Sequence, residues 1–302
     1  MVTESTFFTI IVPVIRAEYL AAALKSVLEQ DFSDWELIVI NDASTDLISE
    51  VVDEFLVDKR FQYVENNFNI GSKSPACVWN QGLALAKGQF TLILGDDDYY
   101  GQGVLKQFYT LSQQHPNANL LRTRLCVVSA EDRIIHCAPR LPKWSPWWDL
   151  LYSRSGYFHH PLSICEHAFL TAKLRNVGGF WELPKAWGSD EATVLKLALD
   201  GGCASTNDAW AYWRNDGRNI SSQPLSPQKS LTLQELYSWQ EKFILENADS
   251  IHDFSCEELL RVVKERGIEA RNEYLYLVQQ KSLRYKIKSS LRNLLSLCSR
   301  WL

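Results

Sequence analysis

The sequence predicts an α/β protein, in which a mostly parallel sheet carries helices on both faces and a helical extension follows at the C-terminus. In the first hundred residues, short apolar runs rich in β-branched and aromatic residues alternate with segments whose apolar residues recur at helical spacing. The runs are Phe7–Val14, Glu36–Ile40, Phe61–Val64 and Phe90–Leu94, and the helical segments are Ala17–Gln30, Thr45–Val57 and Ala76–Lys87. Strands that alternate with helices form a parallel sheet, because each helix returns the chain to the same edge.

The rest of the chain extends this order and then becomes helical. We expect helices at Gly103–Gln114, His167–Arg175 and Asp190–Asp200, and strands at Leu120–Val128, Arg133–Cys137 and Cys203–Trp213. Ser221–Pro227 (SSQPLSP) is a turn-rich linker, and helical patterns fill the sequence after it. We therefore expect two domains, a sheet domain over residues 1–225 and a helical region over residues 226–302.

The composition is that of a folded globular protein, with an uneven distribution of charge. The 302 residues are 46% hydrophobic and 22% charged. The net charge is −5, but six basic residues and no acidic residue follow Tyr274, which leaves −11 on the rest. An acidic body argues against nucleic acid as its partner. The seven cysteines are scattered and form no C-x-x-C pair, so we expect reduced thiols rather than a zinc site or a disulfide framework.

Three consecutive carboxylates, Asp96, Asp97 and Asp98, follow the fourth predicted strand. Ligands of parallel sheets bind beyond the carboxyl ends of the strands, so this position favours a functional role. Carboxylates at this density repel one another unless a cation compensates, and they suit a hard divalent ion such as Mn²⁺ or Mg²⁺. The alternative is that one of them caps the next helix while the others are solvated.

Asp42 follows the second predicted strand directly, at the same edge of the sheet. A carboxylate there is placed to accept hydrogen bonds from a base or a ribose. The position alone leaves a structural role equally open.

Taken together, these segments resemble the inverting family 2 glycosyltransferases, which have the Rossmann-like GT-A fold. The motifs that carry the resemblance are Thr9–Leu20, Asn41–Asp46 (NDASTD), Asn69-Ile70-Gly71, Asn80-Gln81-Gly82, Ala86-Lys87-Gly88, Gly95–Asp98, Val177–Phe180 (VGGF), Ser189-Asp190-Glu191, Arg214 and Asn219-Ile220-Ser221. They cover roughly residues 7–222. The sequence departs from the family pattern at Ile15-Arg16, which comes one residue early, and at Trp79 and Ser189, where the family commonly has Arg and Glu.

The resemblance implies a role for each matching position. The nucleotide would be held by six residues, which are Pro13, Val14, Arg16, Glu18, Asp42 and Asp96. Among them, Asp42 would bind uracil or its equivalent, and Asp96 would bind ribose. Asp97 would be the principal metal ligand with Asp98 nearby, and Asp190 would be the catalytic base.

The function implied is inverting transfer of a hexose or hexosamine from a nucleotide-diphosphate sugar, with a UDP-sugar favoured, to a saccharide or lipid-linked glycan acceptor. A divalent metal would stabilise the diphosphate that leaves, and a carboxylate would take the proton of the attacking hydroxyl. Two alternatives stay open: a nucleotidyltransferase, although Val12–Glu18 lacks the glycine expected in its loop, and a non-catalytic nucleotide- or sugar-binding module.

The C-terminal tail, Lys281–Leu302, places apolar residues on one helical face and basic residues over much of the rest. That pattern is typical of a helix lying on an anionic membrane, and packing of the same face onto the body or onto a partner subunit is an equal alternative. The N-terminus lacks the basic start of a signal peptide. We therefore expect a cytoplasmic protein that is peripheral at the inner face of the membrane.

Overall fold

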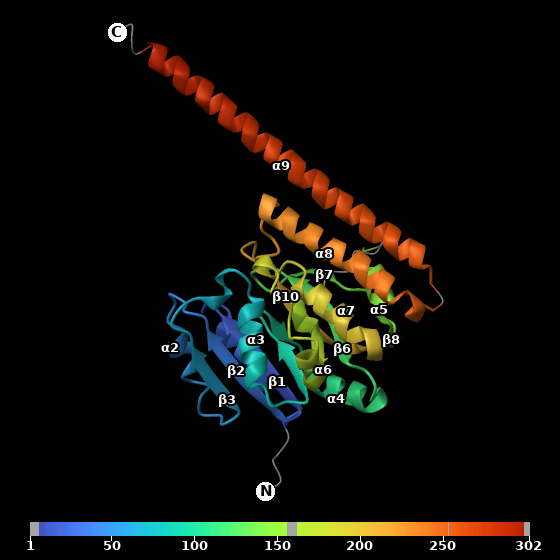
Figure 1. The fold of residues 1–302 in the computed structure, drawn as a ribbon. Helices are drawn as coiled ribbons and strands as arrows, with labels where there is room; N and C mark the ends of the chain where they lie inside the picture. The colour runs from blue at the N-terminus through green and yellow to red at the C-terminus, as the bar shows by residue number, and fades with distance from the viewer. Residues whose placement is uncertain (1–5, 156–161, 253, 299–302) are drawn as a thin grey trace. The chain divides into compact units, whose positions relative to one another are not determined.

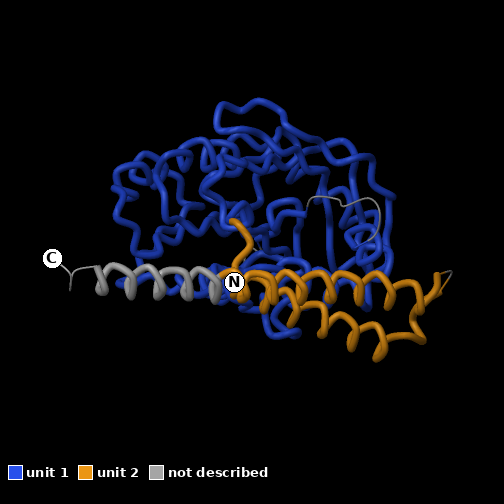
Figure 2. Tube along the Cα trace, turned by 90° about the horizontal axis from the view of Figure 1, so that it is seen from above, with its two compact units in different colours: residues 1–223 blue, residues 224–302 orange. Residues whose placement is uncertain are grey.

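The computed structural model describes residues 6–155, 162–252 and 254–298, and of residues 281–298 it describes only the backbone. The chain divides into two compact units, Met1–Gln223 and Pro224–Leu302 (Figure 2). The first unit contains the sheet. The second contains α8 (Pro227–Glu246), η4 (Ala248–Ser250) and α9 (Cys256–Cys298), and α8 packs against α9.

The described strands of the first unit form one sheet, with the order β3-β2-β1-β4-β9-β6-β10-β5, while β7 pairs with β6 and β8 with β10 (Figure 1). The strands are β1 (Phe8–Val14), β2 (Trp35–Asn41), β3 (Phe61–Glu65), β4 (Phe90–Ile93), β5 (Tyr99–Tyr100), β6 (Leu120–Val128), β7 (Ile134–Cys137), β8 (Trp144–Ser145), β9 (His167–Leu170) and β10 (Cys203–Arg214). Pairing is parallel from β3 through β4 and between β6 and β10.

Helices connect these strands and cover the sheet (Figure 1). They are α1 (Leu20–Leu28), α2 (Ile48–Val52), α3 (Ala76–Leu85), α4 (Val104–Gln114), α5 (Trp147–Ser155), α6 (Thr171–Asn176) and α7 (Ser189–Gly201), with short 3₁₀ turns at η1 (Ile70–Ser72), η2 (Ile164–Glu166) and η3 (Pro184–Ala186).

Both faces of β1 are buried, which is why this strand reads as a continuous apolar run. Ile10 and Val12 belong to the core cluster that includes Leu24 of α1. On the opposite face, α3 approaches so closely that a Cβ on Gly82 would lie 2.5 Å from Cγ2 of Ile11. Glycine at this position therefore lets α3 pack directly on the strand.

One predicted helix is wrong at its start. Residues 167–170 form β9, which pairs antiparallel with β4 and β6, and only Thr171–Asn176 is helical. His167, Ala168 and Phe169 are all buried. A strand between β4 and β6 satisfies its backbone groups on both sides, and this tertiary gain overrides the local helical pattern.

The expectation of reduced thiols is also wrong at one place. Cys126 of β6 and Cys137 of β7 lie opposite each other in the antiparallel pair and form a disulfide. They are eleven residues apart, and only the strand register brings them together.

No helix in the described part of the chain is long and apolar enough to cross a membrane. The side chains of the predicted amphipathic tail, Lys281–Leu302, are not among those that the structure describes. Its backbone is helical as far as Cys298.

Candidate active site

The loops after β1 and β4 are tied together at the carboxyl edge of the sheet. Oδ2 of Asp96, which follows β4, accepts hydrogen bonds from the main-chain amides of Ile15 and Arg16, both at 2.9 Å. These amides follow β1 directly and would otherwise lack a partner. Asp96 thus shapes the turn after Pro13 and Val14, the two predicted nucleotide-binding residues at the end of the strand.

Arg16 stands at the centre of a carboxylate cluster. Its Nη2 lies 2.5 Å from Oδ2 of Asp97, and its Nη1 lies 3.1 Å from Oδ2 of Asp216. Asn219 also donates to Oδ2 of Asp97, at 3.2 Å. The structure therefore brings together predicted residues Arg16, Asp96 and Asp97. Glu18 lies at the rim, where it pairs with Arg218 at 2.5 Å.

Asp98 serves a different part of the molecule. Its Oδ1 accepts the main-chain amide of Arg214 at 3.0 Å, and its carboxyl group is enclosed beside Cys165. Burial and the neighbouring Asp97 hold the pKa of Asp98 well above its usual range. In this arrangement Asp98 joins the loop after β4 to β10, and its predicted role as a metal ligand stays a prediction.

The cluster carries more negative charge than its arginine balances. Burial, and then the charge of Asp97, raise the pKa of Asp96 to about 6, and burial also raises the pKa of Asp97. Asp96, Asp97 and Asp216 surround Arg16, and Arg218 also pairs with Asp216 at 2.6 Å, so the carboxylates still outnumber the arginines once Glu18 is included. Hard oxygen donors with excess negative charge fit a divalent cation such as Mn²⁺ or Mg²⁺.

The described side chains would supply only one or two ligands to such a metal ion. Among the described residues, no group of three or more His, Cys, Asp or Glu side chains is arranged to hold a metal ion. Metals that are shared with substrate phosphates commonly take only one or two protein carboxylates. Asp97, whose Oδ2 faces Arg16 and Asn219, is the residue of this cluster that fits that part.

Asp42 organises the neighbouring loop. Its Oδ1 accepts from Asn66 Nδ2 at 2.8 Å and from the amide of Ile70 at 2.9 Å, and its Oδ2 accepts the amide of Gly71 at 2.7 Å. The side chain is buried, so these donors compensate its charge. A Cβ on Gly71 would lie 2.8 Å from Oδ2, so the loop closes on Asp42 only because this residue is glycine. The contact of Asp42 with a base stays a prediction.

Asp190 lies in the first turn of α7, after Gly188, whose φ of 87° is left-handed and favours glycine. Its Oδ1 accepts the amide of Glu191 at 2.8 Å. Burial raises its pKa to about 6, and the positive charge of Arg154 opposes this shift. A carboxylate with a pKa near 6 accepts a proton more readily than an ordinary aspartate, which suits a general base.

Sequence reasoning assigned no role to several residues that surround these groups. Arg214 was matched to the family pattern only by position, and it holds the main-chain carbonyl of Asp97. Asp216 and Asn219 follow β10 in a polar stretch, NDGRN, whose composition was a usable signal. Arg154 gave no such signal, because nothing in its local sequence points to α7.

Comparison with known proteins gives the family. The model of "Glycosyl transferase family 2" matches residues 9–174, more than half of the chain. The poly(ribitol-phosphate) β-N-acetylglucosaminyltransferase TarS of Staphylococcus aureus is 25% identical over 229 residues, which are 73% of this chain and 38% of that protein. Glycosyltransferase GlyG of Streptococcus pneumoniae is 27% identical over 111 residues, 36% of each chain. The chain thus spans well under half the length of these relatives.

Solved structures agree on the fold. The crystal structure of S. aureus TarS 1–349 in complex with UDP-GlcNAc matches with a TM-score of 0.66 and 21% identity. The matched region is 86% of this chain and 71% of the TarS chain. Mannosyltransferase PcManGT from Pyrobaculum calidifontis, in complex with GDP-Man and Mn²⁺, has a TM-score of 0.57 and 18% identity, and covers 91% and 79%. The predicted α/β fold is confirmed, and the chain belongs to glycosyl transferase family 2.

Proposed function

We propose that this chain is an inverting glycosyltransferase that moves a hexose or hexosamine from a nucleotide-diphosphate sugar to a saccharide or lipid-linked glycan. The observation that carries the proposal is the cluster of Arg16, Asp96 and Asp97 at the carboxyl edge of β1 and β4. Open α/β sheets bind their ligands at this edge. Family membership supports glycosyl transfer over nucleotidyl transfer.

The donor we favour is a UDP-sugar. One similar structure holds UDP-GlcNAc, and another holds GDP-Man with Mn²⁺. The Asn69–Gly71 loop, held by Asp42, and the turn after Val14 would enclose the base and ribose, with Pro13, Glu18 and Asp96 completing the nucleotide site. Arg16 is placed to move from Asp97 to a diphosphate oxygen, since a guanidinium pairs well with either anion.

The reaction needs charge stabilisation on one side of the sugar and proton removal on the other. A bound Mn²⁺ or Mg²⁺, held by Asp97 with Asp98 nearby, would supply neutralisation of the diphosphate. Asp190 takes the proton of the acceptor hydroxyl as its oxygen attacks the anomeric carbon, and the bond from that carbon to the diphosphate breaks. A single displacement inverts the anomeric centre.

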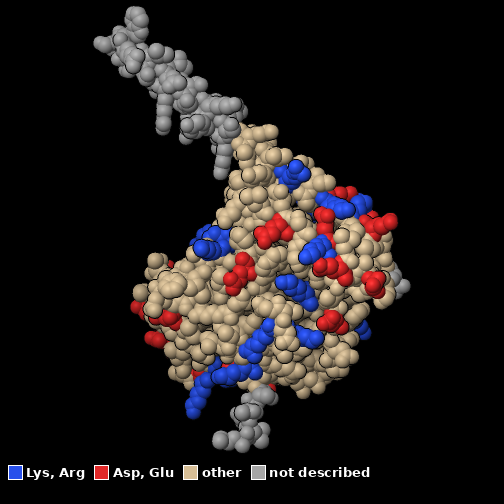
Figure 3. All heavy atoms as spheres, viewed as in Figure 1, with Lys and Arg blue, Asp and Glu red and all other residues tan. Residues whose placement is uncertain are grey.

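The acceptor and the cellular place are proposals of a coarser kind. The relative TarS is named for poly(ribitol-phosphate), and a polymeric or lipid-linked acceptor would suit an enzyme of polysaccharide biosynthesis. On the face drawn in Figure 3, described acidic and basic side chains are interspersed. The support for a peripheral position on the inner face of a cytoplasmic membrane is the sequence of the basic tail.

The test is release of nucleotide diphosphate from a panel of UDP- and GDP-sugars, with and without Mn²⁺, in the presence of simple glycosides. Turnover of one donor that depends on the metal and on Asp190 would support the proposal. Tight binding of a nucleotide sugar with no turnover, by wild-type protein and any acceptor tried, would favour the non-catalytic binding module instead.

A further inference from the structure

The first turn of α7 contains a second acid, Glu191, which is buried beside Asp190. Where the family commonly has Glu before the aspartate, this chain has Ser189, whose Oγ is buried and makes no hydrogen bond within the described residues. Glu191 follows the aspartate directly. Glu191 is only 4% exposed, so its charge requires a partner.

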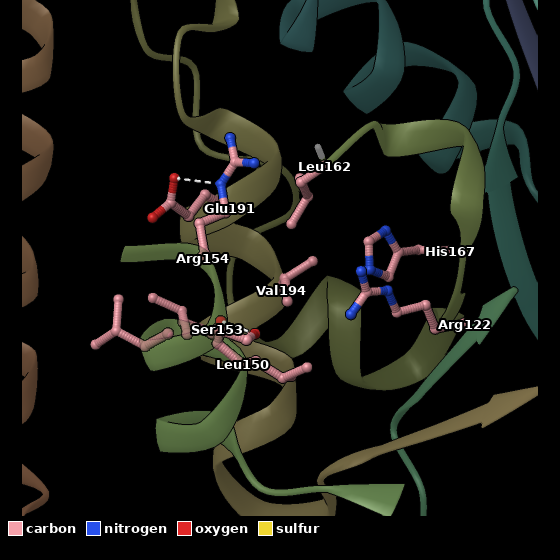
Figure 4. Close-up of a pocket in the computed structure, with 10 residues that line it drawn as sticks. Arg122, Leu150, Ser153, Arg154, Leu162, His167, Glu191 and Val194 are labelled. Atoms are coloured by element: carbon pink, nitrogen blue, oxygen red, sulfur yellow. Dashed lines mark hydrogen bonds and ion pairs between the residues drawn. The ribbon is translucent and has the colours of Figure 1, made fainter. Parts of the chain in front are cut away.

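That partner comes from a separate helix. Nε of Arg154, near the end of α5, lies 3.0 Å from Oε2 of Glu191 (Figure 4). The two side chains are 25% and 5% exposed, so the ion pair is largely withdrawn from water. Charge pairs of this kind are costly to break, because the remaining charge stays buried without compensation.

The neighbouring cavity is too small to be a substrate site. Arg122, His167, Arg154 and Glu191 line it together with apolar residues, and its volume is about 20 Å³ (Figure 4). That is room for roughly one water molecule, and not for a sugar or a phosphate. The Arg154–Glu191 pair therefore stabilises the position of α7 rather than binding a substrate.

Glu191 in turn contacts Asp190, the residue before it in α7. The main-chain amide of Glu191 donates to Oδ1 of Asp190 at 2.8 Å, so the position of the Glu191 backbone orients the carboxylate of Asp190. A catalytic group that is displaced by about 1 Å loses rate steeply, on the order of a hundredfold. An anchor on α5 that holds Glu191, the third residue of α7, is thus of direct use to a base at Asp190, the residue before it.

We propose that Arg154 is a positioning residue for Asp190, acting through the ion pair with Glu191. The inference rests on the proposed function, in which Asp190 is the general base. Arg154 lies on α5 and holds the first turn of α7 through its ion pair with Glu191. Its positive charge also acts on Asp190.

The surrounding charges support this role. Asp190 is faced by Glu191 on its own helix, which raises its pKa, and by Arg154 from α5, which lowers it. Arg154 is in turn influenced by Glu166 of η2. Arg122 of β6 and His167 of β9 lie across the small cavity, and burial keeps the pKa of His167 well below its usual range. Among the described residues, Arg154 is therefore the cation that lowers the pKa of Asp190.

The experiment follows the titration of the Asp190 carboxyl by ¹³C NMR of full-length protein with labelled aspartate, assigned by the signal that Asp190→Asn removes. In Arg154→Met the pKa of Asp190 should rise, because an opposing positive charge is gone. In Glu191→Gln it should fall, because a like charge is gone. Both variants should lose transfer activity on the order of ten- to a hundredfold in kcat with little change in donor KM, and Arg154→Lys should recover part of it.

Arg175→Met is the matched control. Arg175 donates to the carbonyls of Leu83 and Ala86 at 2.8 and 2.6 Å, so its loss removes structural hydrogen bonds away from Asp190. It should lower the melting temperature without moving the titration of Asp190. A shift or rate loss in Arg154→Met no larger than in Arg175→Met, or equal shifts in Arg154→Met and Glu191→Gln, would overturn the proposal.

The same experiment separates this inference from the proposed function. If Asp190→Asn leaves transfer unchanged, Asp190 is not the base and the inference fails with it. If Asp190→Asn abolishes transfer while Arg154→Met retains wild-type titration and rate, the proposed function stands and the role of Arg154 alone is refuted.

Discussion

The amide of Arg214 donates to Oδ1 of Asp98 at 3.0 Å, while Nε of Arg214 donates to the main-chain carbonyl of Asp97, also at 3.0 Å. The rest of the guanidinium reaches the turn between β6 and β7, where it meets the carbonyls of Ser129 and Ala130 and the carboxylate of Asp132. One buried arginine therefore links that turn to the carboxylate loop after β4.

Replacing Arg214 by Met should loosen the carboxylate loop. The change removes the donor to three carbonyls in a site that is 2% exposed, so we expect a loss of about 2–4 kcal/mol in the free energy of unfolding. Urea denaturation measures it. Arg60→Met is the control, because Arg60 pairs with Asp58 at a more exposed position and should cost about 1 kcal/mol or less. Equal losses would show that Arg214 has no special structural role.

Asp97→Asn should remove the part of UDP binding that depends on Mn²⁺, because a neutral amide is a poor ligand for a hard cation. Thermal shift with UDP, with and without Mn²⁺, makes the measurement. Asp53→Asn, at an exposed position, should keep the metal-dependent shift. If Asp97→Asn also keeps it, the metal does not bind at Asp97.

Asp190→Asn should lower transfer by a factor on the order of 10² or more while UDP binding stays near normal. In the wild-type protein the base works only when ionised. Because its pKa is about 6, the rate should fall about tenfold for each pH unit below 6 and level off above 7.

A stability measurement at pH 8 provides the control for Asp190→Asn. Burial disfavours the ionised carboxylate, so the folded state gains nothing from that charge above pH 6, and the variant should melt no earlier than wild type. Early melting together with lost UDP binding would mark Asp190 as a structural residue.

The disulfide between Cys126 and Cys137 should stabilise the first unit in an oxidising buffer. It closes a short loop, for which we expect about 2–3 kcal/mol. A dithiol reductant should lower the melting temperature of wild type and leave that of the Cys126→Ser/Cys137→Ser double variant unchanged. If thiol titration of the unfolded, unreduced protein finds seven free cysteines, the bond does not form in solution.

Removal of residues 281–302 should release the protein from anionic vesicles if the tail is a membrane helix. Each of its six cations would add roughly 1 kcal/mol of attraction at modest ionic strength, and this share should fade with salt. Charge reversal at Lys286 and Lys288 should weaken binding less than the truncation does. Sedimentation with vesicles at low and high salt measures both.

A tail that packs on protein predicts the opposite pattern. Truncation would then lower the melting temperature and leave recovery in the supernatant unchanged. Equal recovery of full-length and truncated protein at low salt would rule out the membrane role.

Local sequence was sufficient to locate β1, β2 and β4, because each is a run of apolar residues long enough to be buried on both faces. Their connections made the sheet parallel, and parallel strands bring their carboxyl ends to one edge. That reasoning is enough to predict Asp42 and Asp97 at a common edge of the sheet.

What the sequence could not supply is the set of partners that join distant segments. Arg214 and Asp98 are 116 residues apart, Arg154 and Glu191 are 37 apart, and neither pair follows from a local period. Residues 167–170 became a strand because two neighbouring strands offered hydrogen bonds on both sides. Periodicity reports which face of an element is buried; which charge lies against it is decided only when the sheet and its helices pack.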